Sequence, residues 1–522
     1  MPSRDSKHDQ QAHRRQSATP LERELSRRKF VQMLGAGGLT LSAGGLLAAC
    51  GGGDSNTATN AAAGPPVRGA TPAERAINGA KALKDKKPIT VLFPSGARDQ
   101  IEPAAIAWRK ATGIEVKLVE QPQTDQLQRI SQESVAKTGA WDIGVVLPKM
   151  VADLVSANAV ENLSGYAERY DPEFEEGPNR IIPPLYSAVK FGGDIYAMPT
   201  DGDVVVAFAR SDLLTDPRRK AAFEDEHGYE LAAPTTWKQY EDIARFFHDP
   251  SNGVYGAVEI RDNTYGPVFF QCRWCSKADP YAYWFSDDME PLVNSDEGLA
   301  AAEEYVRIGE VMHPDSLNWG FTETYAAWAA GRAAIGLGWP SQVKTANTPE
   351  LSKIVGDQTS FVLPGSEIDG EVNQKNYQSF GNSYTINSYG EGNKEVAYAF
   401  TQYLMDPKIG TELLANSGFF DPYRVSHFTN PELVKQYSPG LMGGDGPLAK
   451  DMAVMAPDIN LKGATQYGET LARGLSAAYA GQQPVKEAMD GVAQEWDRIT
   501  DSQGRDEQIE AWGELKQIYP TG

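Results

Sequence analysis

The stretch "KPITVLFPSGARDQIEPAAIAWRKATGIEVKLVEQP", residues 87–122, alternates two patterns of apolar residues. Its first eight residues form a short β-branched run that is typical of a strand. Helical periodicity follows over residues 95–113, and Gly113 supplies a C-terminal stop. Residues 114–122, "IEVKLVEQP", return to the strand pattern. The stretch therefore predicts a strand, a helix and a second strand in succession.

The same alternation continues for one more unit. Residues 123–140 show helical spacing, and "WDIGVVLP" at 141–148 is typical of a buried strand. Three strands separated by two helices predict an α/β fold with a parallel sheet and crossover helices. Ligands of such sheets lie beyond the carboxyl ends of the strands. We therefore expect residues 93–99 and 147–150 at a binding edge.

The N-terminal segment "SRRKFVQMLGAGGLTLSAGGLLAAC", residues 26–50, predicts export. Arg27 and Arg28 resemble the signal that the twin-arginine machinery reads, and five glycines dilute the apolar run that follows. Because glycine weakens a spanning helix, a cleaved signal peptide over residues 1–49 is favoured over an uncleaved anchor. The run ends in Leu-Ala-Ala-Cys, which resembles a bacterial lipobox, so we expect Cys50 to be acylated.

The residues after Cys50 are rich in Gly, Ala, Asn and Thr and show no apolar periodicity. Such a composition does not bury a core, so residues 50–87 are predicted to form a flexible tether. The lipid would hold the protein on the outer face of the cytoplasmic membrane or on a periplasmic membrane face. The remaining body, about 435 residues long, exceeds one ordinary domain and suits two.

The charge balance limits the partners. The whole chain carries −21, and its first fifty residues hold eight Lys/Arg and four Asp/Glu, so the rest carries −25. Nucleic-acid binding requires clustered positive charge, which this body lacks. An acidic body also argues against binding flat on anionic lipid.

Besides Cys50, the chain contains only Cys272 and Cys275, in "QCRWCSK". Outside the cytoplasm this spacing predicts a local disulfide, with inert thiols as the alternative. A redox pair would need a thioredoxin-like strand-to-helix context, which the surrounding sequence does not clearly offer. A single CxxC does not make a zinc ribbon.

A series of short signatures follows along the body: "ATGIEVKL", "WDIGVVLP", "GGDIYAMPTDGDV", "APTTWKQYEDIARFF", "LVNSDEGLAAAEEYV", "AAWAAGRAAIGLGWPSQ", "NSYTINSYGEGNKEVAYAF", "SGFFDPYRVS" and "YAGQQPVKEAMDGVAQEW". Their order and spacing resemble the extracellular solute-binding proteins of ABC importers, in particular the carbohydrate-binding group that includes maltose-binding protein. Each signature is weak alone. Together they cover nearly the whole body, from about residue 88 to its end.

The resemblance implies a type II periplasmic-binding-protein fold, in which crossing strands join two α/β lobes around a ligand cleft. Lobe 1 would comprise residues 88–203 and 384–448, and lobe 2 residues 204–383 and 449–522. A monomer of this kind closes around a small carbohydrate or polyol and delivers it to a membrane permease. It would catalyse no reaction and need no cofactor.

Two carboxylates stand in the predicted first crossing. Asp201 and Asp203, in "PTDGDV", are expected to accept hydrogen bonds from sugar hydroxyls; the alternative is a tight Asp-Gly turn without a ligand. Two acids can also serve a glycosidase, but that chemistry needs a defined separation across a bond, which the sequence does not establish.

Aromatic rings suit the C–H faces of a sugar. Trp339, in "LGWPSQ", ends a predicted strand and resembles the stacking tryptophan of sugar binders, with a role in the lobe core as the alternative. Tyr467 resembles an aromatic residue at a late helix start that faces the cleft. Trp284 and Trp319 lie in aromatic loops, where either ligand binding or loop packing would suit them.

Arg98 and Asp99 follow the first strand, where the resembled family places hydroxyl-binding groups. Arg424 lies in a proline-then-basic loop and is expected either to bind ligand or to pin that loop. The chain departs from oligosaccharide binders at Lys149, because Leu-Pro-Lys follows "WDIGVV" where these binders often carry an aromatic residue. This departure favours a monosaccharide, a disaccharide or a polyol.

Three rival functions stay open. An exported hydrolase is opposed by the absence of G-x-S-x-G and H-E-x-x-H motifs, and the scattered histidines argue against a histidine-based metal site. A solute-binding protein of the same fold for polyamines or ferric ion is the second rival. The third, a surface adhesion or scaffold protein, is opposed by the lobe pattern.

Overall fold

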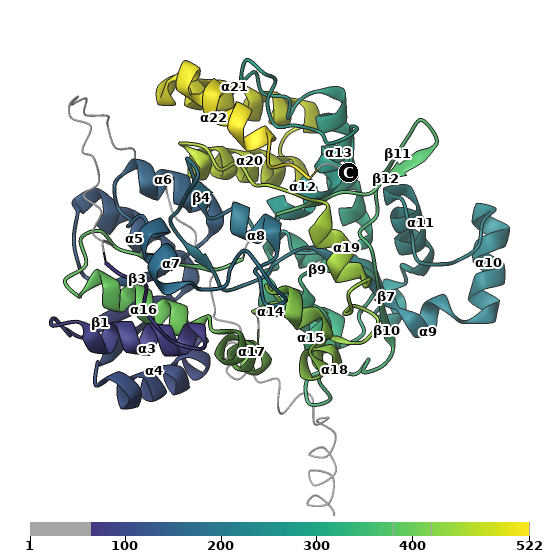
Figure 1. Ribbon diagram of the computed structural model, residues 1–522. Helices are drawn as coiled ribbons and strands as arrows, with labels where there is room; N and C mark the ends of the chain where they lie inside the picture. Colours follow the sequence, from purple (N-terminus) through teal and green to yellow (C-terminus); the bar gives the residue numbers. More distant parts are fainter. Residues whose placement is uncertain (1–63, 379–380, 419, 521–522) are drawn as a thin grey trace, which may run out of the picture.

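The computed structural model describes residues 64–378, 381–418 and 420–520, and these form two α/β lobes, each built on its own sheet (Figure 1). The predicted signal peptide and Cys50 lie outside the described residues. Within the described residues, none of the helices combines the length and the apolar character that a membrane-spanning helix requires.

The first lobe contains a five-stranded sheet in the order β2-β1-β3-β14-β6. β1 pairs in parallel with both β2 and β3, which confirms the predicted parallel sheet. β14 returns from much later in the chain and lies antiparallel to β3 and β6. The strands are β1 (Ile89–Pro94), β2 (Val116–Gln121), β3 (Ile143–Val146), β6 (Met198–Pro199) and β14 (Ser383–Ile386).

Helices connect and cover these strands. The predicted helix after β1 ends at Gly113, whose φ of 77° is easy for glycine and whose N–H bonds to the carbonyl of Arg109. The helical elements of this lobe are α3 (Pro72–Ala82), α4 (Arg98–Thr112), α5 (Gln123–Ala136), η1 (Pro148–Met150), α6 (Val151–Ser156), α7 (Ser164–Tyr170), α8 (Pro183–Ser187), α16 (Lys394–Leu404), α17 (Pro407–Asn416), η5 (Val425–Thr429) and α18 (Pro431–Tyr437). A small hairpin joins β4 (Lys190–Phe191) to β5 (Asp194–Ile195).

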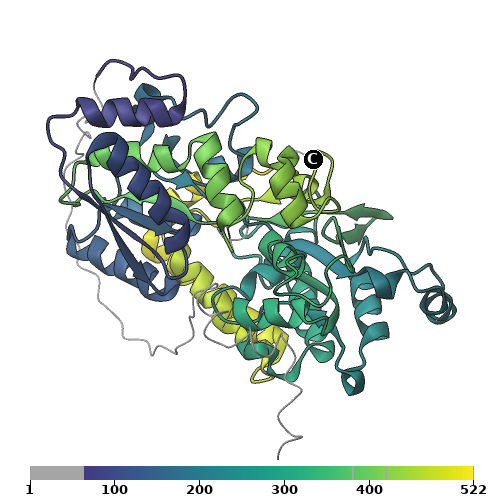
Figure 2. The same ribbon diagram turned by 90° about the horizontal axis from the view of Figure 1, so that it is seen from below.

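Residues 50–87 were predicted to form a flexible tether, but part of this segment forms the helix α3. Thr71 caps the helix through the N–H of Glu74, and α3 packs along α16 (Figure 2). Arg75 fixes the helix to the lobe by donating to the carbonyl of Tyr170 at 2.9 Å and to Glu173 at 2.8 Å. The small Ala-rich face of α3 is buried, so this segment belongs to the folded body.

The second lobe contains a four-stranded sheet in the order β10-β7-β9-β8. Every residue of β9 is buried, and Thr236 caps α11 in a capping box with Gln239. The strands are β7 (Val206–Arg210), β8 (Tyr255–Val258), β9 (Ala333–Gly338) and β10 (Gln358–Phe361), with a separate hairpin of β11 (Ser366–Ile368) and β12 (Glu371–Asn373).

The helices of the second lobe surround this sheet, and the C-terminal helices pack beside α12 and α13 (Figure 1). They are α9 (Ser211–Leu214), α10 (Pro217–His227), α11 (Trp237–Phe247), η2 (Pro250–Asn252), α12 (Pro267–Cys275), α13 (Asp296–Arg307), η3 (Ile308–Val311), η4 (Pro314–Asn318), α14 (Phe321–Ala329), α15 (Pro340–Ala346), α19 (Pro447–Ala453), α20 (Ala464–Tyr479), α21 (Val485–Gln503) and α22 (Arg505–Lys516).

Three chain segments cross between the lobes and bond to one another. Residues 200–205 lead from β6 to β7, and Val204 forms a bridge with Gln378 on the way back to β14. That return segment begins with β13 (Asn376–Tyr377), which pairs in parallel with β15 (Met455–Ala456) on the third crossing. These hydrogen bonds gather the crossings into one hinge region.

Candidate functional site

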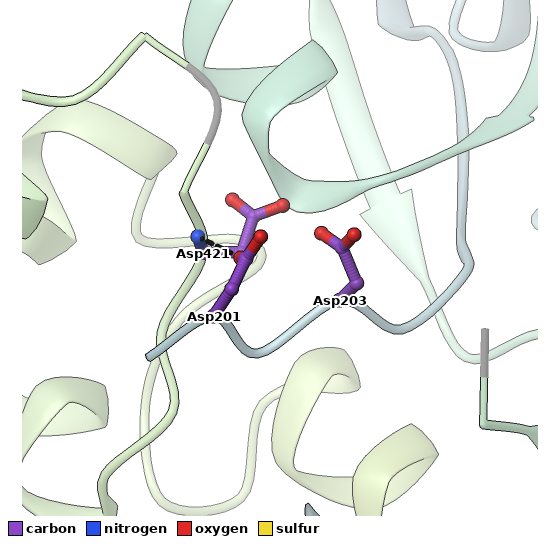
Figure 3. A group of neighbouring side chains, drawn as sticks. All are labelled: Asp201, Asp203 and Asp421. Carbon is purple, nitrogen blue, oxygen red and sulfur yellow. Dashed lines mark hydrogen bonds between the residues drawn. The ribbon is translucent and has the colours of Figure 1, made fainter. Parts of the chain in front are cut away.

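Three carboxylates meet where the first crossing touches the loop after α17. Asp201 and Asp203 come from the crossing and Asp421 from the loop, and Figure 3 shows their side chains directed toward one another. One oxygen from each lies within 4.8 Å of the other two. The three residues are 2%, 7% and 0% exposed. The sequence analysis found the first two, and the fold adds the third.

Backbone and amide donors orient two of these acids. Asp201 accepts from the N–H of Asp421 at 2.7 Å and from Nδ2 of Asn382 at 2.8 Å. Asp203 accepts from the N–H of Gly381 at 3.0 Å. Gly202 stands between them because a Cβ at this position would collide with the carbonyl of Pro422. The crossing and the loop are therefore packed backbone against backbone, and the carboxylates have fixed positions.

Burial and mutual repulsion favour the protonated forms of the cluster. Burial, followed by the charge of Asp421, raises the pKa of Asp201 to about 8. Burial and then the Asp201 charge raise the pKa of Asp203 well above its usual value. Two unit charges 4.8 Å apart repel by roughly 3 kcal/mol at an effective dielectric constant of about 20. In the absence of a ligand, the cluster therefore retains protons at neutral pH.

Asp421 has the weakest set of partners. Burial raises its pKa to about 6, although the N–H and hydroxyl of Ser341 and the hydroxyl of Tyr437 hold the pKa down. Neither Asp421 oxygen forms a hydrogen bond of normal geometry with a described residue. The nearby ammonium of Lys344 is engaged by the carbonyls of Leu414 and Ser417, at 3.2 and 2.7 Å. The Asp421 carboxylate is thus poised to accept from another molecule.

Aromatic side chains stand beside the carboxylates. The hydroxyl of Tyr325 lies 2.9 Å from that of Ser341, and burial followed by the Asp421 charge raises the Tyr325 pKa. Burial raises the pKa of Tyr265 as well, with contributions from Asp262 and Asp203. The site thus combines hydrogen-bond acceptors with ring surfaces.

Trp339 joins this group as the residue before α15. Its ring is fully buried and contacts Phe321 at a centroid distance of 4.9 Å, with the Phe269 and Tyr265 rings edge-on at 5.6 and 5.9 Å. Trp339 thus lies at the end of β9, as predicted, but its ring packs among aromatic residues of the core, which agrees with the alternative of a role in the lobe core.

A family model described as bacterial extracellular solute-binding protein matches residues 103–437. The chain belongs to this family. The family is extracellular, so the protein is an exported one. A comparison with curated proteins gives no match.

Solved structures share the maltose-binding-protein-like fold of this solute-binding protein. A ribitol complex from Agrobacterium radiobacter K84 is 19% identical, covers 80% of this chain and 99% of its own, and has a TM-score of 0.67. The maltose-bound MalE3 of T. maritima is 19% identical over 79% of this chain and all of its own, with a TM-score of 0.65. A D-mannitol complex from Agrobacterium vitis S4 is 18% identical over 80% and 99%, with a TM-score of 0.63.

Two predicted ligand-binding aromatics instead belong to the core of the solute-binding protein. Trp284 is 1% exposed and stacks on Trp274 at 5.4 Å. Tyr467 is fully buried, and its hydroxyl lies 2.8 Å from that of Thr500. Both rings pack against Trp496 inside the second lobe. For Trp284 this packing agrees with the alternative of loop packing, whereas the cleft-facing position predicted for Tyr467 is not observed.

Trp319 is only half-buried, but its ring stacks on His313 at 4.5 Å. This contact agrees with the alternative of loop packing. The backbone carbonyl of Trp319 also accepts a hydrogen bond from the backbone N–H of Arg261. This bond links the end of η4 to the loop after β8.

The two predicted arginines serve local structure. Arg98 pairs with Glu120 at 3.0 Å and with Glu102 at 3.4 Å, which holds α4 on β2. Arg424 is buried and donates to the carbonyls of Asn179 and Met405, which agrees with the alternative that it pins its loop. The side chain of Asp99 lies outside the described part of the structure, so its predicted role stays a prediction.

The predicted disulfide is absent: Cys272 and Cys275 are free and buried. They lie one turn apart on α12, and Cys275 Sγ contacts the carbonyl of Cys272 at 3.3 Å. Burial raises the pKa of both thiols, which agrees with the alternative of inert thiols.

Two polar contacts between the lobes escaped the sequence analysis. Asp153 on α6 accepts from the N–H groups of Gly463 and Thr465, at 2.7 and 3.1 Å, at the start of α20. Burial lowers the pKa of Lys149, while the charge of Asp458 on the third crossing opposes this shift. The sequence around a single Asp or Lys in a short helix does not indicate that its partner lies about three hundred residues away.

Proposed function

We propose that this protein is the substrate-binding component of an ABC importer. It would capture a small polyhydroxylated solute, a mono- or disaccharide or a polyol, between its lobes and deliver it to a membrane permease. The observation that carries the proposal is the cluster of Asp201, Asp203 and Asp421 at the hinge, near the tyrosines Tyr265 and Tyr325.

The chemistry of the cluster suits hydroxyl groups. Carboxylate oxygens accept hydrogen bonds from hydroxyls, and protonated members of the cluster can donate as well. Asp201 already accepts from protein donors, so Asp203 and Asp421 have the greater free capacity. The ribitol, D-mannitol and maltose complexes that share the fold support a polyol or sugar as the solute.

The composition of the cleft supports a short solute. Lys149 is the second residue of η1, the short helix that follows β3. The carboxylate of Asp458, on the third crossing, interacts electrostatically with the Lys149 ammonium. Asp458 itself accepts from the hydroxyl of Tyr377 at 2.5 Å. These ionic groups occupy a stretch where an oligosaccharide would need an aromatic surface, so one or two sugar units are favoured.

The remaining features of the proposal concern location and chemistry. We assign residues 1–49 to a twin-arginine signal peptide and Cys50 to the lipid anchor, with the body held outside the cytoplasm as a monomer. The protein would bind and release its solute without catalysis. In this proposal the carboxylates bind the ligand and so stabilise the closed arrangement of the lobes; they cleave no bond.

A ligand panel tests the proposal. Thermal unfolding of the purified protein with ribitol, mannitol, monosaccharides, disaccharides and spermidine should show stabilisation by a polyol or sugar, about 2.7 kcal/mol at 100 times the Kd. Asp421→Asn should weaken that binding by roughly ten- to 150-fold, since a hydrogen bond to a charged acceptor contributes about 1.5–3 kcal/mol.

Asp451→Asn is the matched control, because Asp451 is a buried acid outside the cluster. It accepts from the N–H of Leu363 at 3.0 Å, and burial raises its pKa to about 8. This variant should bind the solute as the parent does. Stabilisation by spermidine alone, or sugar affinity equal in both variants, would contradict the proposed ligand class or its site.

A further inference from the structure

We propose that Asp201, Asp203 and Asp421 together bind one divalent cation, with Ca²⁺ as the best-fitting ion. The site would lie at the hinge and would use the same carboxylates that the proposed function assigns to the solute. It would supply three protein ligands from two segments that are more than two hundred residues apart in the chain.

The spacing of the oxygens matches calcium. Ca²⁺ binds oxygen at about 2.3–2.6 Å, so two ligands on opposite sides of the ion stand up to roughly 5 Å apart. Mg²⁺ at about 2.0–2.1 Å would need its ligands within roughly 4.2 Å. The three oxygens of the cluster lie within 4.8 Å of one another, a spacing that the ligand shell of Ca²⁺ accommodates.

The state of Asp421 is a separate observation that points to a ligand. Its side chain is completely buried, and neither oxygen forms a hydrogen bond of normal geometry with a described residue, although the N–H and hydroxyl of Ser341 and the hydroxyl of Tyr437 lie near enough to lower its pKa. Figure 3 shows the Asp421 carboxylate lying in one group with those of Asp201 and Asp203. A buried carboxylate without a full set of partners is costly. A cation held by all three acids would remove that cost.

The surroundings leave the cluster without a protein counter-ion. Among the described residues, no Lys, Arg or His forms an ion pair within 4.0 Å of the three carboxylates. Lys344 influences Asp421 from a distance, but its ammonium donates to the carbonyls of Leu414, Ala415 and Ser417. The negative charge must therefore be neutralised by protons or by a bound cation.

Calcium usually takes six to eight oxygens, so three carboxylates form only part of its shell. Water would fill the remaining positions, and hydroxyls of a polyol could replace that water. The cation would then sit between protein and solute. Because cation binding displaces the protons of the cluster, affinity should rise with pH.

Terbium luminescence gives a direct test, because Tb³⁺ replaces Ca²⁺ and neighbouring Tyr325 and Tyr265 can sensitise it. Purified protein stripped with EDTA is titrated with Tb³⁺ at pH 8 and pH 5, followed by competition with Ca²⁺ and Mg²⁺. We expect saturable emission at one site, displacement by Ca²⁺ at lower concentration than by Mg²⁺, and weaker binding at pH 5.

Variants decide whether the cluster is the site. Asp203→Asn and Asp421→Asn should each weaken Ca²⁺ binding by about tenfold or more, whereas Asp451→Asn should leave it unchanged. Thermal unfolding with Ca²⁺ supplies a second readout that does not depend on Tb³⁺, and circular dichroism checks that each variant is folded.

The outcomes separate this proposal from the proposed function. A polyol or sugar that stabilises the EDTA-treated protein, without any response to Ca²⁺, would refute the cation site and leave the solute assignment intact. Ca²⁺ binding that persists in both cluster variants would place an adventitious ion elsewhere on the acidic surface and also refute the site. Binding of spermidine in place of Ca²⁺ would show that the cluster receives an organic cation.

Discussion

Replacing Asp421 with asparagine should stabilise the ligand-free protein at neutral and alkaline pH. The carboxyl group is completely buried, and burial raises its pKa from 3.8 to about 6. Each pKa unit corresponds to about 1.4 kcal/mol. The ionised carboxylate therefore costs the folded state about 3 kcal/mol, a cost that the neutral amide avoids.

The pH dependence follows from the direction of the shift. Below about pH 4 the carboxyl is protonated in both folded and unfolded chains, so its ionisation costs no stability. Between about pH 4 and 6 the folded protein keeps the proton that the unfolded chain releases, and stability falls as the pH rises. Above the folded pKa the loss is complete. Asp421→Asn should therefore differ from the parent by about 3 kcal/mol at pH 8 and by little at pH 4.

Urea unfolding at pH 4.5, 6 and 8, in EDTA and without solute, measures this difference. The parent should lose stability over this range more steeply than Asp421→Asn. A variant that is less stable than the parent at pH 8, or a difference that does not change with pH, would show that the carboxylate is satisfied by a protein cation such as Lys344. That result would also remove the argument for a cation at the cluster.

Three further predictions concern other parts of the molecule. Cys272 and Cys275 should resist a thiol reagent at pH 8 in the folded protein and react in urea, because burial raises their pKa; fast reaction of the native protein would contradict this. Arg75→Ala should cost about 1–3 kcal/mol and expose α3 to limited proteolysis, whereas unchanged resistance would show that apolar packing alone holds the helix. Asp153→Ala should loosen the lobes by removing its bonds to α20, costing about 0.5–2 kcal/mol, and small-angle scattering should then report a larger radius of gyration; an unchanged radius would refute a role in closure.

Much of the fold could be predicted from local pattern. The strands β1, β2 and β3 combine β-branched runs with clear helical connections, so their parallel order followed from the sequence. The tether was wrong at α3 because the apolar residues of this helix are mostly alanines, which resemble linker composition. The local signal was Thr71 followed by proline, a capped helix start that the neighbouring low-complexity segment obscured.

The site was predictable only in part. Asp201 and Asp203 stood out because they follow a proline-threonine turn within a crossing segment. Asp421 completes the cluster through a contact over more than two hundred residues, which no local pattern encodes. Trp284 and Tyr467 showed the converse difficulty, since a sequence rich in aromatic residues does not reveal which rings enter the core.

Because α3 packs on α16, an attachment at the N-terminal segment would immobilise one particular lobe of the molecule. Because α3 also contacts α4 and α7, any force transmitted through the N-terminal segment reaches the first lobe. The second lobe is then the half that swings when a solute binds. An immobilised form of this protein, held by its N-terminal segment and labelled at the exposed Val372 on β12, would therefore report solute as a displacement of the label relative to the support.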